Sequence, residues 1–170
     1  MKIRQEENKD FDTIHELIKI SFQSAEYTDG NEQDLVNELW KGNGYIKELS
    51  LVAEIDGNII GHIMFTKVKI GDSVQLALAP LSVLPKYQKQ GIGGMALIKE
   101  GHKRAVDLGY EYSIVLGDDK YYSKMGYLPA KNYEIFSPLD VPSKNFMACK
   151  LIEDASDISG IVQYAKEFGI

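Results

Sequence analysis

The chain has 170 residues, of which 44% are hydrophobic and 26% charged, and this globular composition predicts a single domain over 1–170. The net charge of −6 argues against a nucleic-acid partner, because general nucleic-acid binding needs a basic face. Cys149 is the only cysteine, the N-terminus is polar and no apolar run approaches the ~20 residues that cross a bilayer, so we expect no disulfide, no CxxC zinc site or other metal, no membrane partner and a cytoplasmic location.

The first half of the chain reads as one strand, two helices and an antiparallel meander of three strands. The helices are expected because apolar residues recur at spacings of three and four, as they do from Phe11 to Phe22. The meander is expected because Asp56-Gly57 and Gly71-Asp72 separate apolar runs, as hairpin turns do. The predicted ranges are 1–6 for the first strand, 11–22 and 29–40 for the helices, and 49–55, 59–70 and 74–84 for the meander.

Pro80 lies inside the last strand of this meander. Because proline has no N–H to donate, a regular central ladder cannot pass through this position. We therefore expect a bulge at Pro80, or a point where the strand leaves its neighbour. A strand that leaves its neighbour exposes backbone donors and acceptors with which a ligand can pair.

The second half begins with a polar loop that contains glycines and a helix from Gly94 to Leu108, which Gly109 ends. A strand over 111–116 follows and should run parallel to the strand over 74–84, because a helix joins the two. A short helix over 119–124 comes next, and 130–170 is predicted to hold the C-terminal strands and tail, with strands near 133–136 and 146–151. The inner face of the longer helix is predicted to hold Met95, Ile98, Gly101, His102 and Ala105.

The glycine loop between a strand and a helix N-terminus is typical of an anion cradle. Glycines allow close approach of the backbone, and the first N–H groups of the helix have no helical partner. The surrounding residues, 61–104, carry seven basic and two acidic side chains, although the whole chain is acidic. A tight turn that merely needs glycine is the alternative. The fingerprint of a dinucleotide site matches 91–96, but it does not open directly from a strand, and Glu111 begins the next strand rather than ending it.

Two segments resemble the GCN5-related N-acetyltransferases, and in particular one bacterial subgroup of predicted acetyltransferases. Residues 81–93, Leu-Ser-Val-Leu-Pro-Lys-Tyr-Gln-Lys-Gln-Gly-Ile-Gly, are similar to the central motif of that family, Gln/Arg-x-x-Gly-x-Gly/Ala after a strand that ends in Val-x-Pro. Residues 121–127, Tyr-Tyr-Ser-Lys-Met-Gly-Tyr, are similar to its aromatic-Tyr-x-Lys-x-Gly-aromatic signature. The two motifs stand in the order of the family, with one helix and one strand between them.

The resemblance implies a fold and a ligand. The fold is a mixed α/β architecture in which helices flank a mixed sheet whose fourth and fifth strands splay apart. The ligand is acetyl-CoA, used as a cosubstrate, whose pantetheine arm would pair with Leu81, Ser82 and Val83 inside the splay. Tyr121 would line the cofactor groove. The pyrophosphate would lie on the amides of Gln88, Lys89, Gln90, Gly91, Ile92, Gly93 and Gly94.

The resemblance also implies catalytic roles. Tyr122 would be the general acid that protonates the leaving thiolate, and the backbone N–H of Val83 would donate to the carbonyl oxygen. The general base is open. Glu26, Glu54 and Asp118 are the candidates, and a water relay or the capture of a small neutral amine fraction is equally compatible with the sequence. His62 and His102 are expected to be structural.

The acceptor is expected to be a primary amine of a small molecule that attacks directly in a ternary complex. A protein substrate is the less favoured acceptor. The alternative of a different class is a non-catalytic acyl-CoA-binding protein that regulates a partner, since the fourth strand offers no carboxylate as base. Homodimers are common in the family, so a homodimer stays open.

Overall fold

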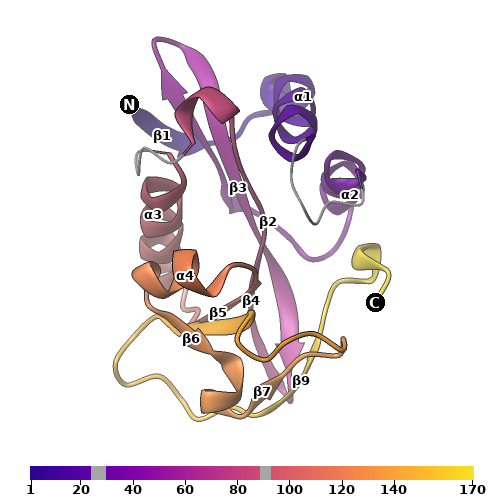
Figure 1. Cartoon of the computed structure of the whole chain (residues 1–170), viewed down its shortest axis with the longest axis vertical. Coiled ribbons are helices and arrows are strands. Elements are labelled where there is room, and N and C mark those ends of the chain that lie inside the picture. The colour runs from indigo at the N-terminus through magenta and orange to yellow at the C-terminus, as the bar shows by residue number, and fades with distance from the viewer. Residues whose placement is uncertain (24–29, 89–92) are drawn as a thin grey trace.

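The computed structural model describes residues 1–23, 30–88 and 93–170, so the predictions for Glu26, Lys89, Gln90, Gly91 and Ile92 lie outside the described residues. Within these ranges the sheet has the strand order β1-β2-β3-β4-β5-β8-β6, and β9 pairs with β3 and β7. Figure 1 shows helix α3 on one side of the long strands β2 and β3, with α1 and α2 on the other. The sheet is therefore covered on both faces.

The N-terminal elements agree with the predicted pattern. They are β1 (Lys2–Gln5), α1 (Phe11–Phe22) and α2 (Glu32–Leu39). Ile14, Leu17 and Ile18 are buried on one face of α1 and pack with Val52 and Met64 of the sheet. The apolar spacing thus places one stripe of the helix on the core, as a period of 3.6 residues requires.

The meander is confirmed as β2 (Tyr45–Ile55), β3 (Asn58–Ile70) and β4 (Ser73–Val83), all antiparallel. Its first turn has positive φ at both Asp56 (52°) and Gly57 (80°), which a type I′ hairpin turn requires. The strand predicted over 49–55 begins earlier, at Tyr45, where a register shift separates Tyr45 from the regular ladder that starts at Ser50.

Both consequences expected of Pro80 are present. The β3–β4 register shifts between the pairs Ile63↔Leu81 and Phe65↔Leu78. On the other edge, β4 pairs in parallel with β5 (Tyr112–Leu116) at residues 76 and 77 alone. The two strands have therefore parted before Pro80, and the splay opens beside residues 78–83.

Helix α3 (Gly94–Asp107) connects β4 to β5 and packs on the sheet face opposite α1. Its buried face holds Leu97, Ile98, Gly101 and Ala105, so the predicted face is wrong by one residue: Leu97 is inside, whereas Met95 is only half-buried. Gly101 is needed there because a methyl group at this position would overlap the ring of Phe65.

The C-terminal third contains two strands that the sequence pattern missed. Besides the predicted β7 and β8, it has β6 and β9, which are three and four residues long. Helix α4 is one turn long and continues as the 3₁₀ helix η3. The bounds are Asp119–Tyr122 for α4, Ser123–Met125 for η3, Tyr127–Pro129 for β6, Ile135–Phe136 for β7, Phe146–Lys150 for β8, Gly160–Gln163 for β9 and Lys166–Phe168 for the last 3₁₀ helix, η5.

Candidate functional site

The edge of β4 at the splay presents backbone groups that do not pair with β3. The N–H of Leu84 donates to the Ile60 carbonyl at 2.9 Å, so the alternation of an antiparallel ladder turns the N–H and C=O of Val83 and of Leu81 away from β3. The side-chain partners of the Val83 carbonyl agree with this direction, because Gln88 Nε2 donates to it at 2.8 Å and Ser21 Oγ at 3.1 Å. The Val83 N–H consequently faces the gap between β4 and β5.

A pocket of about 220 Å³ lies beside this edge, at the N-terminus of α3. Six of the residues predicted to bind the cofactor line it together: Leu81, Val83, Gln88, Gly93, Gly94 and Tyr121; Tyr87 completes the lining. A methyl group at Gly94 would overlap the hydroxyl of Tyr121, and one at Gly93 would lie 3.2 Å from a methyl of Val83. The two glycines therefore let Tyr121 and Val83 approach the N-terminus of α3 closely, next to amide donors that suit an anion.

Ser82 departs from the prediction for this pocket. Its register partner is His62, with which it forms a hydrogen-bonded pair of the β3–β4 ladder, so its backbone groups are turned toward β3. Its side chain, by alternation, points to the face covered by α1. Ser82 is thus excluded from the cofactor edge by the same pleat that presents Leu81 and Val83.

Tyr121 and Tyr122 are placed by the end of β5 and the start of α4. The Asp118 side chain caps α4 by accepting the N–H of Lys120 at 2.9 Å. The two tyrosine rings meet edge to face at 5.0 Å, and the Tyr122 ring covers Gly117 so closely that a methyl group there would overlap it. Burial raises the pKa of Tyr122 above the usual range of a phenol, so its hydroxyl keeps its proton at neutral pH.

The two described candidates for the general base are each engaged elsewhere. Glu54 forms an ion pair with Arg4 at 2.7 Å on the β1–β2 side of the sheet. Asp118 is exposed and serves as the cap of α4. Neither carboxylate is held at the β4 edge, and we therefore do not retain either as the preferred base.

The histidine on the α3 face and the cysteine are structural. His102 Nε2 bonds the Tyr127 hydroxyl at 2.9 Å, and that hydroxyl also bonds Ser113 Oγ at 2.9 Å. Burial lowers the pKa of His102 to about 4 and raises that of the Cys149 thiol to about 11. Both side chains are therefore neutral at pH 7.

The contact between Ser21 and Val83 is one that sequence reasoning missed. Ser21 lies in the last turn of α1 and bonds both its own helix, at the Leu17 carbonyl, and the Val83 carbonyl. A serine near a helix end carries no sequence signal for a partner 62 residues away. Its position shows that the end of α1 lies against β4 at the splay.

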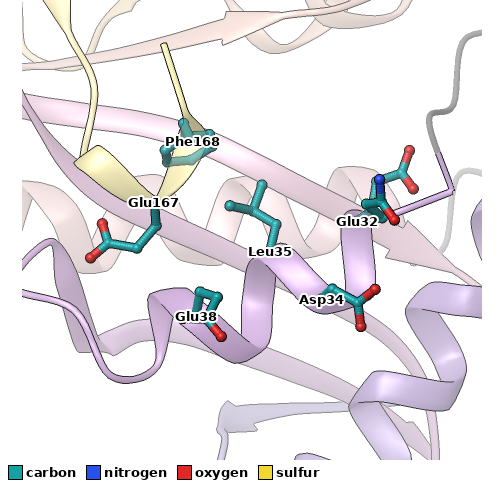
Figure 2. A pocket seen from close by; sticks show the side chains of 7 residues that line it. Glu32, Asp34, Leu35, Glu38, Glu167 and Phe168 are labelled. Atoms are coloured by element: carbon teal, nitrogen blue, oxygen red, sulfur yellow. The ribbon is translucent and has the colours of Figure 1, made fainter.

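A second pocket, of about 430 Å³, lies between α2 and the C-terminal η5. Figure 2 shows Leu35 facing Phe168 across it, with the side chains of Asp34, Glu38 and Glu167 around them. Its rim is acidic, which suits a cationic group.

In the ranges that the structure describes, no group of three or more histidine, cysteine, aspartate or glutamate side chains could hold a metal ion. Among the described helices, none is long and apolar enough to cross a membrane.

Comparison with known proteins gives a consistent result. The model of the Acetyltransferase (GNAT) family matches residues 11–127. The chain is 32% identical to the uncharacterized N-acetyltransferase YhbS of Escherichia coli K12 over 172 residues, which cover 99% of this chain and 98% of that protein. It is 33% identical to the uncharacterized N-acetyltransferase YjhQ of the same strain over 129 residues, 72% of this chain and 69% of that protein.

Solved structures extend the similarity to the fold. The crystal structure of E. coli YhbS in complex with CoA has a TM-score of 0.89 and 30% identity to this chain, covering 99% of this chain and 92% of that one. A GNAT family acetyltransferase from Brucella melitensis in complex with acetyl-CoA has a TM-score of 0.80 and 30% identity, with 98% and 97% covered. The mixed sheet with splayed strands that the two motifs implied is thereby confirmed.

Proposed function

The chain belongs to the Acetyltransferase (GNAT) family, and we propose that it moves the acetyl group of acetyl-CoA to a primary amine of a small molecule by direct attack in a ternary complex. The observation that carries this proposal is the free edge of β4 next to the glycine N-terminus of α3. The crystal structures of two relatives with similar folds are of complexes with CoA and with acetyl-CoA, which supports the choice of acetyl-CoA as cosubstrate.

The described residues suit two parts of such a ligand, the pantetheine arm and the pyrophosphate. Leu81 and Val83 offer backbone groups to the amides of a pantetheine arm, as an added strand would use them. Gly93 and Gly94, with the first N–H groups of α3, suit a pyrophosphate. Bound acetyl-CoA would supply an activated thioester, so the protein needs no covalent intermediate of its own.

We assign the protein's part in the chemistry to two groups. The Val83 N–H faces the gap from β4 and would donate to the carbonyl oxygen as negative charge develops on it. The Tyr122 hydroxyl, beside the end of β5, would donate its proton to the leaving sulfur. The raised pKa of this phenol supports the role of an acid that is fully protonated before the reaction.

A small cationic amine is the acceptor class that the charges favour. Residues 1–60 carry six basic and 13 acidic side chains, and the pocket between α2 and η5 has an acidic rim (Figure 2). Such a surface raises the local concentration of an ammonium ion. A lysine side chain on a protein would be attracted in the same way, which is why a protein acceptor is kept as the second candidate.

The test is a screen of primary amines with acetyl-CoA, in which the release of free thiol is followed. Acetylation of a small amine that depends on the enzyme is the expected result. Saturable binding of acetyl-CoA without acetylation of any amine or peptide would instead identify a non-catalytic acyl-CoA-binding protein, and the proposed reaction would be wrong.

A further inference from the structure

Four buried polar side chains cross the sheet in a row on the face covered by α1 and α2. The row runs over successive strands, from Glu6 just after β1 to Ser50 of β2, His62 of β3 and Ser82 of β4. Their exposed fractions are 5%, 0%, 0% and 2%. Apolar neighbours such as Val52 and Met64 lie on the same face, so this polar row interrupts a hydrophobic layer.

The Glu6 end of the row is saturated with hydrogen bonds. Trp40 Nε1 and the Tyr45 hydroxyl donate to Glu6 Oε2 at 2.5 and 2.8 Å. Ser50 Oγ and His62 Nε2, the latter at 2.8 Å, bond Oε1. Burial raises the pKa of this carboxyl, but the hydrogen bond and the electrostatic attraction of His62, together with the other bonds, outweigh burial and leave the pKa below its usual value. Glu6 is therefore a carboxylate that fixes the imidazole with Nε2 toward itself.

The Ser82 end of the row is unsatisfied. In the part of the chain that the structure describes, neither His62 Nδ1 nor Ser82 Oγ has a hydrogen-bond partner, although both atoms are buried. The two residues are register partners on β3 and β4 and share one face. Because Nε2 is the nitrogen that bonds Glu6 and Ser50, Nδ1 is the ring nitrogen that is left for another partner.

This unsatisfied end lies at the splay. Ser82 stands between Leu81 and Val83, which line the cofactor pocket from the opposite face. Ser21, at the end of α1, bonds the Val83 carbonyl and closes the same corner from the α1 side. Polar side chains thus lie on successive strands from this corner of the sheet to a buried carboxylate. In the described structure Ser82 Oγ and His62 Nδ1 do not bond each other, so the Ser82 hydroxyl has to turn toward its register partner for a proton to pass between them.

We propose that this row is the proton relay of the acetyl transfer, with His62 as proton acceptor and Glu6 as the positioning residue; the inference rests on the function proposed above. The acceptor ammonium loses one proton to Ser82 Oγ as the Ser82 hydroxyl proton moves to His62 Nδ1. The neutral amine then attacks. The second proton that its nitrogen gives up replaces the one that Tyr122 donates to sulfur, and the proton on Nδ1 returns to solvent by the same route when the product leaves.

The relay has few charged neighbours that could set its pH dependence. Above it α1 contributes the apolar side chains Ile14, Leu17 and Ile18. The charged and titratable side chains of α1 and α2 are exposed, except for His15 and Glu32, which are half-buried. The other such groups are Glu6, Tyr45 and Glu48 near the carboxylate end, and the ion cluster of Arg4, Asp10 and Glu54 on the same side of the sheet. Arg4 neutralises part of that cluster, so the carboxylate of Glu6 is the charge in direct contact with His62.

The first test compares two variants, each of which removes one buried hydroxyl on this face of the sheet. Thr66 of β3 is fully buried and, within the described chain, its Oγ1 is as unpartnered as Ser82 Oγ. Neither Ser82→Ala nor Thr66→Val removes a hydrogen bond seen in the structure, so both variants should fold. For the best amine of the screen, we expect Ser82→Ala to lower kcat by about 100-fold, within the range of general base catalysis, and to leave the KM for acetyl-CoA unchanged. Thr66→Val should retain kcat, and equal rates for the two variants would overturn the relay.

His62→Gln tests the relay through the pH dependence of the rate, which would not change if His62 had only a structural role. The rise of kcat/KM with pH should flatten in this variant, and the loss of rate should be much smaller with hydroxylamine, which is largely unprotonated at neutral pH. An equal loss with both acceptors and an unchanged pH profile would mean that His62 only supports the fold.

An acceptor-free measurement separates failure of the relay from failure of the proposed function. Nitrogen NMR of the protein with labelled histidine should give a His62 Nδ1 signal that moves in Ser82→Ala and stays in Thr66→Val. An Nδ1 signal that is insensitive to Ser82→Ala would overturn the relay even if an amine is acetylated. If no amine is acetylated, the proposed reaction fails, and the relay, which rests on it, fails with it.

Discussion

Tyr122 is the side chain whose surroundings match a single chemical task most closely. Its ring lies between Tyr121, Tyr127 and Gly117, and burial raises its pKa. A phenol in this state donates a proton and does not act as a base near neutral pH.

Tyr122→Phe keeps the ring contacts and removes the donor. We expect turnover to fall by about 100-fold or more, the range of general acid catalysis. The affinity for acetyl-CoA should stay unchanged, because the hydroxyl would act on the sulfur only as the thiolate leaves. Thiol release and calorimetry measure the two quantities. Tyr133→Phe, in the separate cluster around Tyr112, is the control and should retain turnover. Full turnover in Tyr122→Phe would exclude this acid.

His102 makes stability depend on pH in a direction that its burial fixes. Burial lowers the pKa of His102 from 6.5 to about 4. Between pH 6.5 and pH 4, His102 therefore binds a proton in the unfolded chain but not in the folded protein. The free energy of unfolding therefore falls as the pH drops from 6.5 toward 4. From pH 7 to pH 5 this residue should account for a loss of about 2 kcal/mol.

Urea denaturation at pH 7 and at pH 5 measures this loss. The wild-type protein should lose about 2 kcal/mol more than His102→Gln over this interval, although the variant is less stable at pH 7 because its bond to Tyr127 is changed. Identical losses for the two proteins would show that His102 titrates normally in the folded state.

At the scale of elements, α3 is fixed to the sheet at one close approach. A methyl group at Gly101 would overlap the Phe65 ring, and both residues belong to the interface between the helix and the sheet. Alanine normally stabilises a helix interior relative to glycine by about 1 kcal/mol. Overpacking a core costs about 1–3 kcal/mol, so here the steric term should exceed the helix propensity.

Gly101→Ala should consequently lower the free energy of unfolding by up to about 2 kcal/mol, as followed by urea denaturation. Lys99→Ala, at an exposed position of the same helix, should change it by less than about 0.5 kcal/mol. A variant Gly101→Ala that is more stable than the wild type would show that Phe65 yields without cost.

The elements that were predicted correctly are those with a local cause. The Asp56-Gly57 turn needs positive φ, and Pro80 cannot donate to a ladder, so hairpin and splay follow from single residues. Strands β6 and β9 were missed because they are short and exist through pairing with β8, β3 and β7. A segment of three or four residues is too short for its pattern of apolar residues to indicate that it pairs with a strand elsewhere in the chain.

The residues of the candidate site likewise fall into those that a local sequence motif predicts and those that it does not. The glycine loop and the tyrosine pair are motifs and were found as such. Ser21 at Val83 and the row from Glu6 to Ser82 arise when residues far apart in the chain share one face of the sheet. The sequence predicts only a structural role for His62, because a lone histidine in a strand reveals neither its carboxylate nor its unsatisfied nitrogen.

For the whole molecule, the central claim is that the splay and the N-terminus of α3 together bind acetyl-CoA. The chain is acidic overall, yet residues 61–104, which contain β4 and α3, carry seven basic and two acidic side chains. An anionic ligand should therefore bind to this part of an otherwise repulsive surface.

Calorimetric titration with acetyl-CoA tests this claim most directly, with NADH as the control ligand. A matched pair of variants locates the site: Gly94→Glu places a carboxylate in the cofactor pocket, whereas Val106→Glu adds the same charge at an exposed position near the other end of α3. The account predicts saturable binding of acetyl-CoA and none of NADH, with binding abolished in Gly94→Glu and retained in Val106→Glu. No binding of acetyl-CoA by the wild type at millimolar concentration, or equal binding by both variants, would contradict it.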